Sequence, residues 1–251
     1  MPMTLLQRLA ALEESGERGV LFTVVEGDDA GSKLLVLESG ERIGDAREAA
    51  AAQFDELIRG GRNAVLTLED GTKVFAEWYG PPPRLFAYGA VDLAEAVCRA
   101  AKLLGWKTIV ADARAKFATP ERIPSADELL VLWPDEALAH VQPDHQTAIV
   151  VLTHEDKFDE PALEGALETE AFYIGALGSR RNQERRRERL LENGVPEEAL
   201  ARIMGPSGLD IGADSLEETA LSILSEILAV RAQRPGGSLR DAKQRIHVEV
   251  E

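Results

Sequence analysis

The sequence of 251 residues contains a single cysteine, Cys98, and has no long apolar run. One cysteine excludes an intramolecular disulfide and a metal site built from several cysteines, and its alanine-rich helical surroundings favour a packing role over a reactive thiol. No stretch reaches the roughly 18 apolar residues that a membrane-spanning helix needs. Residues 1–16 combine charges with an apolar face, which is unlike a signal peptide. We therefore expect a cytoplasmic protein without a membrane span.

Positive charge is scarce as well, with 28 Lys and Arg residues against 44 Asp and Glu residues and a formal net charge of −16. A chain this acidic repels a phosphate backbone, so we expect no general nucleic-acid binding. Residues 180–189 are an exception, because six arginines there outnumber two glutamates. The local field of this segment is therefore positive.

Recognisable nucleophile–base patterns are also missing. The sequence has no Ser/His/Asp order and no Cys/His pair with a known local signature, and His154 is the one histidine in a promising place. The whole sequence is 45% hydrophobic, which is sufficient for a sizeable core in one large domain or two small ones.

We predict that residues 1–80 form a small α+β domain. The periodicity of apolar residues and the turn residues between them define its elements. They are a helix over residues 4–14 with Thr4 as N-cap, strands over 20–25 and 33–37 and around Ile43, a helix over 46–59, and a hairpin of 64–68 and 73–78.

The proline run at residues 81–83 marks a boundary, because consecutive prolines fit neither a helix nor a central strand. After it, strands alternate with helices over residues 84–234, which is typical of a parallel sheet with helices on its faces. We predict strands over 85–88, 107–111, 129–132, 147–152 and 171–174. One helix is expected to open near Pro161, since proline is tolerated in a first turn. The tail, 235–251, alternates apolar residues and suggests an edge strand, a contact with a second copy of the chain, or a loose terminus.

The first strand-to-helix turn of the second domain resembles a degraded dinucleotide fingerprint. Gly89 and Ala94 fit its first and third small positions, but Val91 occupies the position where the backbone should approach a pyrophosphate. Asp92 adds a negative charge beside it. Asp112, at the end of the next strand, is placed either to bind a ribose hydroxyl or to cap its own loop.

Two later loops carry candidate binding residues at the same predicted sheet edge. Arg114 is a candidate phosphate ligand, with a surface ion pair as the alternative. Thr153 and His154 follow a fully apolar strand, so they emerge where ligands of open α/β sheets bind. Glu155 and Asp156 beside them are candidates for a metal or a ligand hydroxyl, and the alternative is capping of the next helix.

The segment 172–212 has the layout of an anion site. Gly175 and Gly178 break an apolar run, and Ser179, Arg180 and Arg181 follow at the start of an arginine-rich helix. Freed backbone N–H groups, the positive helix end and paired guanidinium groups would converge on one anion. Further on, the loop 205–212 contains Asp210, which either accepts hydrogen bonds from a heterocycle or caps a turn.

Five blocks of the sequence resemble successive motifs of the XdhC/CoxI family. These are FAYGAVDLAEAV, VADARAKFATPERIP, VVLTHEDKFDEPAL, FYIGALGSRRN and GLDIGADSLEETALSILSEILAVR. The resemblance is dense over residues 81–231. It implies a Rossmann-like carboxyl-terminal domain, that is, a doubly wound parallel sheet, after the small α+β domain.

The resemblance also implies a function. Members of this family are accessory proteins that mature molybdenum hydroxylases such as xanthine dehydrogenase, binding the molybdenum cofactor (molybdopterin) and delivering it. The implied cofactor-binding residues are Gly89, Asp112, Arg114, Thr153, His154, Gly175, Gly178, Ser179, Arg180 and Asp210.

Two departures accompany the resemblance. The family's usual Gly-Ala-Gly-His turn reads Gly-Ala-Val-Asp at residues 89–92, and its Ser-Gly-Gly-Cys segment is missing after Gly44. We therefore expect a non-catalytic chaperone whose partner is a molybdenum hydroxylase, with a homodimer possible. The alternatives are an NAD(P)-dependent oxidoreductase with a degenerate fingerprint, and a scaffolding module without a cofactor.

Overall fold

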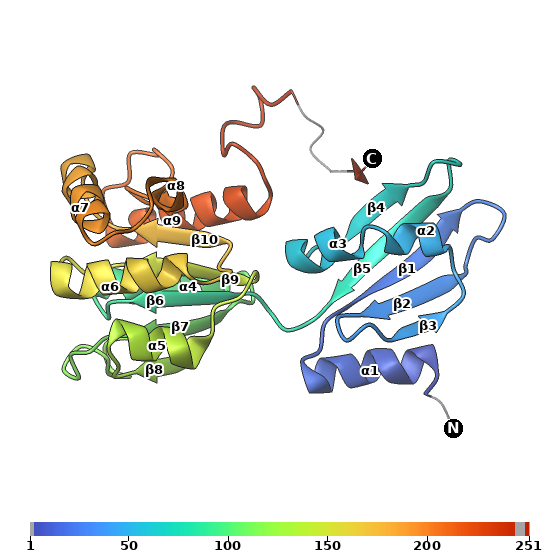
Figure 1. The fold of residues 1–251 in the computed structure, drawn as a ribbon, viewed down its shortest axis with the longest axis horizontal. Coiled ribbons are helices and arrows are strands. Elements are labelled where there is room, and N and C mark those ends of the chain that lie inside the picture. Colours follow the sequence, from blue (N-terminus) through green and yellow to red (C-terminus); the bar gives the residue numbers. More distant parts are fainter. Residues whose placement is uncertain (1–2, 244–248, 251) are drawn as a thin grey trace. The chain divides into compact units, whose positions relative to one another are not determined.

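The computed structural model describes residues 3–243 and 249–250 (Figure 1). The chain forms two compact units. One is made of Met1–Pro81 and Gly237–Glu251, and the other is Pro82–Gly236.

The first unit is built on a six-stranded sheet with the strand order β12-β4-β5-β1-β2-β3. Its pairs are antiparallel, except that β12 runs parallel to β4. The strands are β1 Gly19–Glu26, β2 Lys33–Leu37, β3 Arg42–Gly44, β4 Ala64–Thr67, β5 Lys73–Tyr79 and β12 Glu249–Val250.

The apolar side chains of the strands alternate between the two faces of this sheet. Helices therefore pack on both faces. Val20, Phe22 and Val24 pack with α3, whereas Leu21 packs on the opposite face with Leu12 of α1. Thr4 caps α1 in a capping box, as predicted. The helices are α1 Leu5–Ser15, α2 Glu48–Ala51 and α3 Phe54–Gly60.

One prediction for this unit is wrong, and one of the alternatives for the tail is found in the structure. The single helix predicted over 46–59 is wrong, because the chain breaks between α2 and α3, where backbone N–H groups of Ala52 and Gln53 bond three residues back instead of four. The tail supplies an edge strand, since Glu249 and Val250 pair with β4. Ile246 and Val248, on which the tail prediction also depended, lie outside the described residues.

The second unit has an all-parallel six-stranded sheet in the order β11-β10-β9-β6-β7-β8. The chain first runs from β6 outward to β8 and then returns to build β9, β10 and β11 on the other side of β6, so a topological switch lies between β6 and β9. This confirms a Rossmann-like, doubly wound α/β fold. The strands are β6 Arg84–Tyr88, β7 Lys107–Ala111, β8 Glu128–Leu130, β9 Thr147–Val151, β10 Tyr173–Ala176 and β11 Ile203–Met204.

Two apolar clusters hold helices against the two faces of this sheet (Figure 1). On one face α4 and α9 pack together, and Cys98 is buried among them with its thiol pKa raised by burial to about 12. On the other face lie α5, α6, α7 and α8. The helices are α4 Asp92–Lys102, α5 Pro134–Val141, α6 Asp156–Leu167, α7 Arg180–Glu192, α8 Glu197–Leu200 and α9 Leu216–Arg231.

Two boundaries differ from the sequence prediction near the candidate site. Helix α6 begins at Asp156 and holds Pro161 in its interior, because the burial of Phe158 and Asp159 fixes an earlier first turn. Gly175 lies inside β10 and does not break it. Glycine is required there because a Cβ at this position would lie 2.6 Å from the ring of Tyr173, two residues back on the same strand face.

Within the described part of the chain, every helix is too short or too polar to traverse a lipid bilayer.

The core of the second unit gives a stability prediction. Leu163 on α6 is fully buried, so Leu163→Ala should lower the free energy of unfolding by about 2–5 kcal/mol through lost contacts and the cavity left behind. Leu103, at the end of α4, is 85% exposed, and Leu103→Ala should change it by less than about 0.5 kcal/mol. Urea unfolding followed by circular dichroism measures both. Equal effects of the two substitutions would contradict this packing.

Candidate functional site

The carboxyl ends of the parallel strands bring most of the predicted site residues to one edge of the second unit. Gly89 follows β6, Asp112 follows β7 and Thr153 follows β9 closely, while Ser179 precedes α7 after β10. Because β6 and β9 are neighbours, this edge includes the topological switch, where open α/β sheets bind ligands.

The carboxylate of Asp112 is buried, and both of its oxygens accept hydrogen bonds. It is 1% exposed, and its Oδ2 accepts hydrogen bonds from the Ala90 backbone N–H at 2.9 Å and from Arg114 Nη2 at 2.7 Å. Its Oδ1 accepts from Arg114 N and Nε at 2.9 and 2.8 Å. Burial alone would raise the pKa of Asp112, but these hydrogen bonds hold it below its ordinary value. The carboxylate therefore closes its own loop and ties it to the turn after β6.

The turn after β6 is packed against the loop after β9. Gly89 has a φ of +109°, and a Cβ there would lie 2.5 Å from Thr153 Cγ2 and 2.9 Å from the Thr153 backbone nitrogen. Only glycine allows this approach. Beyond it, Val91 packs on the apolar cluster below, and Asp92 forms an ion pair with Arg122 at 2.7 Å.

Arg114 links the loop after β7 to the loop after β9. Its Nη1 lies 2.5 Å from Glu155 Oε1, and its guanidinium carbon lies 4.2 Å from the centre of the Phe117 ring and 5.3 Å from that of Phe158. Its side chain is 21% exposed. With Asp112 and Glu155 as partners, Arg114 is one member of a carboxylate network and has no unpaired charge to offer.

A buried ion pair lies behind Thr153. Thr153 Oγ1 donates to Asp159 Oδ1, and Asp159 Oδ2 lies 2.8 Å from Arg186 Nη2, with Asp159 1% and Arg186 5% exposed. Arg186 also donates to Gln183 Oε1 at 2.6 Å and to the Leu177 carbonyl at 3.2 Å. Burial raises the pKa of Asp159, and the hydrogen bonds from Thr153 and Arg186 oppose that rise. The network fixes α6, α7 and the ends of β9 and β10 to one another.

Above this ion pair is a polar pocket of about 190 Å³ between α6 and α7. Two of its arginines are already paired, Arg186 with Asp159 and Arg189 with Asp156 at 2.7 Å. Arg185 forms no ion pair within residues 3–243 and 249–250, so it supplies uncompensated positive charge. The pocket is lined by His154, Asp156, Asp159, Asn182, Arg185, Arg186 and Arg189.

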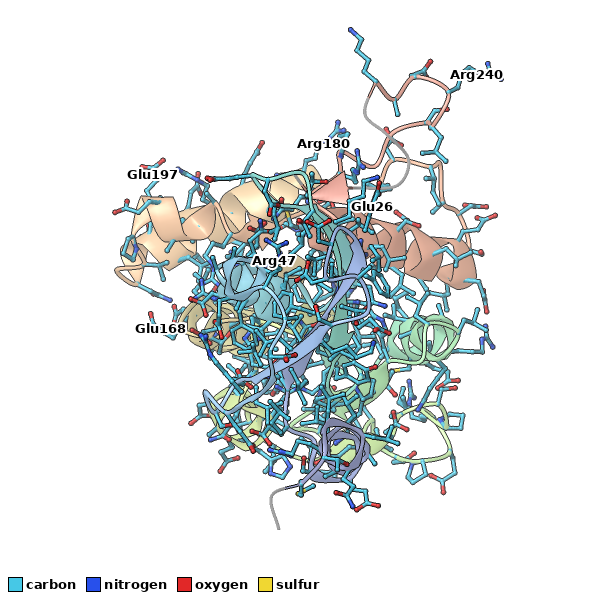
Figure 2. The ribbon with its side chains drawn as sticks, turned by 90° about the vertical axis from the view of Figure 1, so that its right-hand side faces the viewer. Glu26, Arg47, Glu168, Arg180, Glu197 and Arg240 are labelled. Carbon is cyan, nitrogen blue, oxygen red and sulfur yellow. The ribbon has the colours of Figure 1, made fainter. Side chains whose placement is uncertain are left out.

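The start of α7 has the predicted glycine–serine turn, but the Ser179 hydroxyl caps the helix itself. Gly178 has a φ of +134°, and Ser179 is the N-cap, with its Oγ accepting from the Asn182 N–H at 3.3 Å. Arg180 and Arg181 are exposed, and Figure 2 shows Arg180 at the surface. In the described part of the chain neither arginine forms an ion pair.

Gly175 and Asp210 do not join this pocket. Gly175 pairs with Val150 inside the sheet. The loop that holds Asp210 is tied to α9, because Gly208 N donates to Glu226 and Ser222 Oγ donates to the Leu209 carbonyl, at 2.9 and 2.6 Å. Asp210 itself is exposed.

A larger cavity of about 380 Å³ lies between α7, α8 and β11, on the other side of α7. Leu190, Leu200 and Ile203 form apolar parts of its lining, and Arg187 and Glu197 form an ion pair beside it. Figure 2 labels Glu197 on the outer surface of α8. None of the predicted site residues lines this cavity.

Sequence reasoning missed Asn182, Arg185, Arg186 and Arg189, and it treated Asp159 only as a residue near the start of a helix. The four residues of α7 share one side of the helix, because they are spaced by three and four positions. That spacing was the available signal within the arginine-rich segment. Glu155 and Asp156, candidates for a metal, are paired with arginines. Across residues 3–243 and 249–250, no three His, Cys, Asp or Glu side chains are grouped to hold a metal ion.

The role of Asp112 can be tested by pH. Its lowered pKa means that it stabilises the folded state above about pH 4, and that this stabilisation is lost as the pH falls through the folded-state value. Asp112→Asn should lower the free energy of unfolding by about 3 kcal/mol at pH 7, with the difference from wild type shrinking below about pH 4. Asp156→Asn, whose paired side chain is 65% exposed, should cost less than about 1 kcal/mol. Urea unfolding at several pH values measures both, and an unchanged stability of the Asp112 variant at pH 7 would contradict a structural role.

Comparison with known proteins identifies relatives of this architecture. The chain is 35% identical over 185 residues to the uncharacterised protein YqeB of Escherichia coli, covering 72% of this chain and 34% of that protein. It is 32% identical to a probable xanthine dehydrogenase component of Bacillus subtilis, covering 64% and 46%, and 31% identical to the molybdenum cofactor insertion chaperone PaoD of Escherichia coli, covering 62% and 43%. The matched part of this chain thus spans less than half the length of each of these relatives.

A solved structure from Bacillus halodurans, described as a xanthine dehydrogenase, has the same fold. It matches with a TM-score of 0.56 and 20% identity over 94% of this chain and 98% of that one. The model of the XdhC Rossmann domain matches residues 85–227, which include β6, the turn after it, the pocket between α6 and α7, and most of α9. The chain therefore belongs to the XdhC family.

Proposed function

We propose that this protein binds the molybdenum cofactor and delivers it to a molybdenum hydroxylase such as xanthine dehydrogenase. Support comes from two relatives, one named as a probable component of xanthine dehydrogenase and the other as a molybdenum cofactor insertion chaperone. The cofactor is cargo in this role, and its redox chemistry belongs to the enzyme that receives it. The residues of this chain bind and orient it, without catalysing a reaction themselves.

The pocket between α6 and α7 fits the phosphate of this cofactor. A phosphate needs several hydrogen-bond donors and uncompensated positive charge, and this pocket combines the unpaired Arg185 with Asn182 and His154. The field of residues 180–189 attracts an anion in an otherwise acidic chain. The observation that carries the proposal is that Arg185 lines the pocket and forms no ion pair in the described part of the chain. A bound phosphate would supply the missing partner.

The residues predicted from sequence take different parts in this proposal. Gly178, Ser179 and Arg180 lie at the start of α7, just before the pocket residue Asn182; Ser179 keeps its hydroxyl on its own helix, and Arg180 forms no ion pair in the described part of the chain. Thr153 positions the loop that carries His154, because its hydroxyl is fixed to Asp159.

A dinucleotide-dependent oxidoreductase fits less well. Asp112, the residue placed to bind a ribose hydroxyl, is 1% exposed and accepts four hydrogen bonds from Ala90 and Arg114. A nucleotide would have to break these bonds to reach it. A molybdenum hydroxylase as partner and a homodimer stay predictions.

Two arginines on α7 allow a matched test. Arg185 faces the polar pocket without an ion pair, whereas Arg187 faces the other side and is paired with Glu197. Arg185→Ala should weaken retention of purified molybdenum cofactor roughly 10- to 150-fold, the effect of losing a hydrogen bond to a charged group. Arg187→Ala removes the same charge from the same helix and should weaken retention by less than about threefold, because solvent and salt screen it. Gel filtration with fluorescence detection of oxidised pterin measures retention.

Parallel incubation with NAD(P) separates the competing hypotheses. We expect retention of the molybdenum cofactor and no retention of NAD(P). Retention of NAD(P) alone would favour the oxidoreductase, and retention of neither would leave a scaffolding role.

A further inference from the structure

Trp133 is exposed at the ligand-binding edge of the second unit. It lies between β8 and α5, three residues after β8 ends, and 51% of its surface is exposed. Trp106 is 3% exposed and Trp78 is half-buried, so Trp133 is the most open of the three tryptophans. An indole is the largest apolar side chain, and its exposure beside a binding edge calls for an explanation.

The indole of Trp133 rests on a fixed base. Its ring centre lies 5.2 Å from that of Phe158, with the two planes at 54°, and Phe158 is buried in the first turn of α6. The Trp133 backbone N–H donates to Glu136 Oε2 at 3.1 Å, which holds the residue at the start of α5. One part of the ring is therefore held by packing while the rest faces solvent, ready to stack on a planar group.

The surroundings of Trp133 favour a small planar ligand over a protein surface. The exposed apolar neighbour in sequence is Val131, 50% exposed, and after the buried Pro134 the chain continues with the charged, exposed Asp135 and Glu136. Lys157 and Arg114 lie near the Phe158 ring, at 4.6 and 5.3 Å from its centre. A patch of this size matches one ring system, whereas protein interfaces use larger apolar areas.

We propose that Trp133 stacks on the pterin ring of the molybdenum cofactor. This inference rests on the proposed function and adds to it the residue that recognises the heterocycle. Phe158, Asp156 and Asp159 all belong to the first turns of α6, where Phe158 contacts Trp133 and the two aspartates line the phosphate pocket. Trp133 and the pocket therefore contact different sides of the amino-terminal end of α6. We take the distance between them as about one helix diameter, or 10 Å, which one ligand would span with its ring at Trp133 and its phosphate in the pocket.

The indole N–H signal of Trp133 reports stacking directly. In the ¹⁵N-labelled full chain, titration with pterin (2-amino-4-oxopteridine) should shift the indole signal of Trp133 and leave those of Trp78 and Trp106 in place. Inorganic phosphate should instead shift the guanidinium Nε–H signal of Arg185. Pterin leaving the Trp133 signal unmoved would overturn the inference.

Substitutions supply the affinity test. Trp133→Ala should weaken pterin binding about 5- to 150-fold, whereas Trp133→Phe keeps a stacking face and should weaken it by less than about threefold. Val131→Ala, at an equally exposed neighbouring position, should leave it unchanged. Backbone amide shifts of the α6 first turn give the dissociation constants in the variants that lack the indole, and the unchanged spectrum elsewhere shows that they fold.

The outcomes separate this inference from the proposed function. If wild-type protein retains the molybdenum cofactor and Trp133→Ala retains it equally well, stacking is overturned and the delivery role stands. If Trp133→Ala impairs binding of a molybdenum hydroxylase but not of pterin, Trp133 is a protein contact and the inference also fails. If wild-type protein retains no molybdenum cofactor, the proposed function itself fails.

Discussion

The buried ion pair of Asp159 and Arg186 is the interaction on which the candidate site depends. Two charges removed from water are costly unless their remaining hydrogen bonds are made, and here Thr153, Gln183 and the Leu177 carbonyl complete most of them. Through these bonds the ion pair joins α6, α7 and the ends of two neighbouring strands. The walls of the pocket between α6 and α7 are therefore fixed by these contacts, which would reduce the ordering that ligand binding requires.

The edge of the sheet uses its acidic residues for structure. Asp112 closes the loop after β7 around Arg114, and Asp159 anchors α7, so neither carboxylate is open to a ligand. A dinucleotide-binding Rossmann domain keeps the first of these positions for a ribose hydroxyl. In this chain the proposed anion ligands are the arginines of α7, on the other side of the switch.

The sequence was sufficient to predict the parallel sheet and most of its strands, because buried parallel strands are continuous apolar runs and β7 begins and ends where predicted. It was also sufficient for the N-cap Thr4, which is a local signal. The prediction that Gly175 breaks the apolar run was wrong, because this residue lies inside β10 against the ring of Tyr173 two residues away. The roles of Arg185 and Arg186 depend on how α7 is rotated against α6, which tertiary packing determines and local sequence does not.

The central claim is that the molybdenum cofactor binds at the carboxyl edge of the second unit, with its phosphate between α6 and α7. A crystal structure of the protein with this cofactor, recorded at the molybdenum absorption edge, tests it most directly. We predict an anomalous peak near the loop that carries His154, with phosphate density against Arg185. A peak in the first unit, or in the cavity between α7 and α8, would contradict the claim.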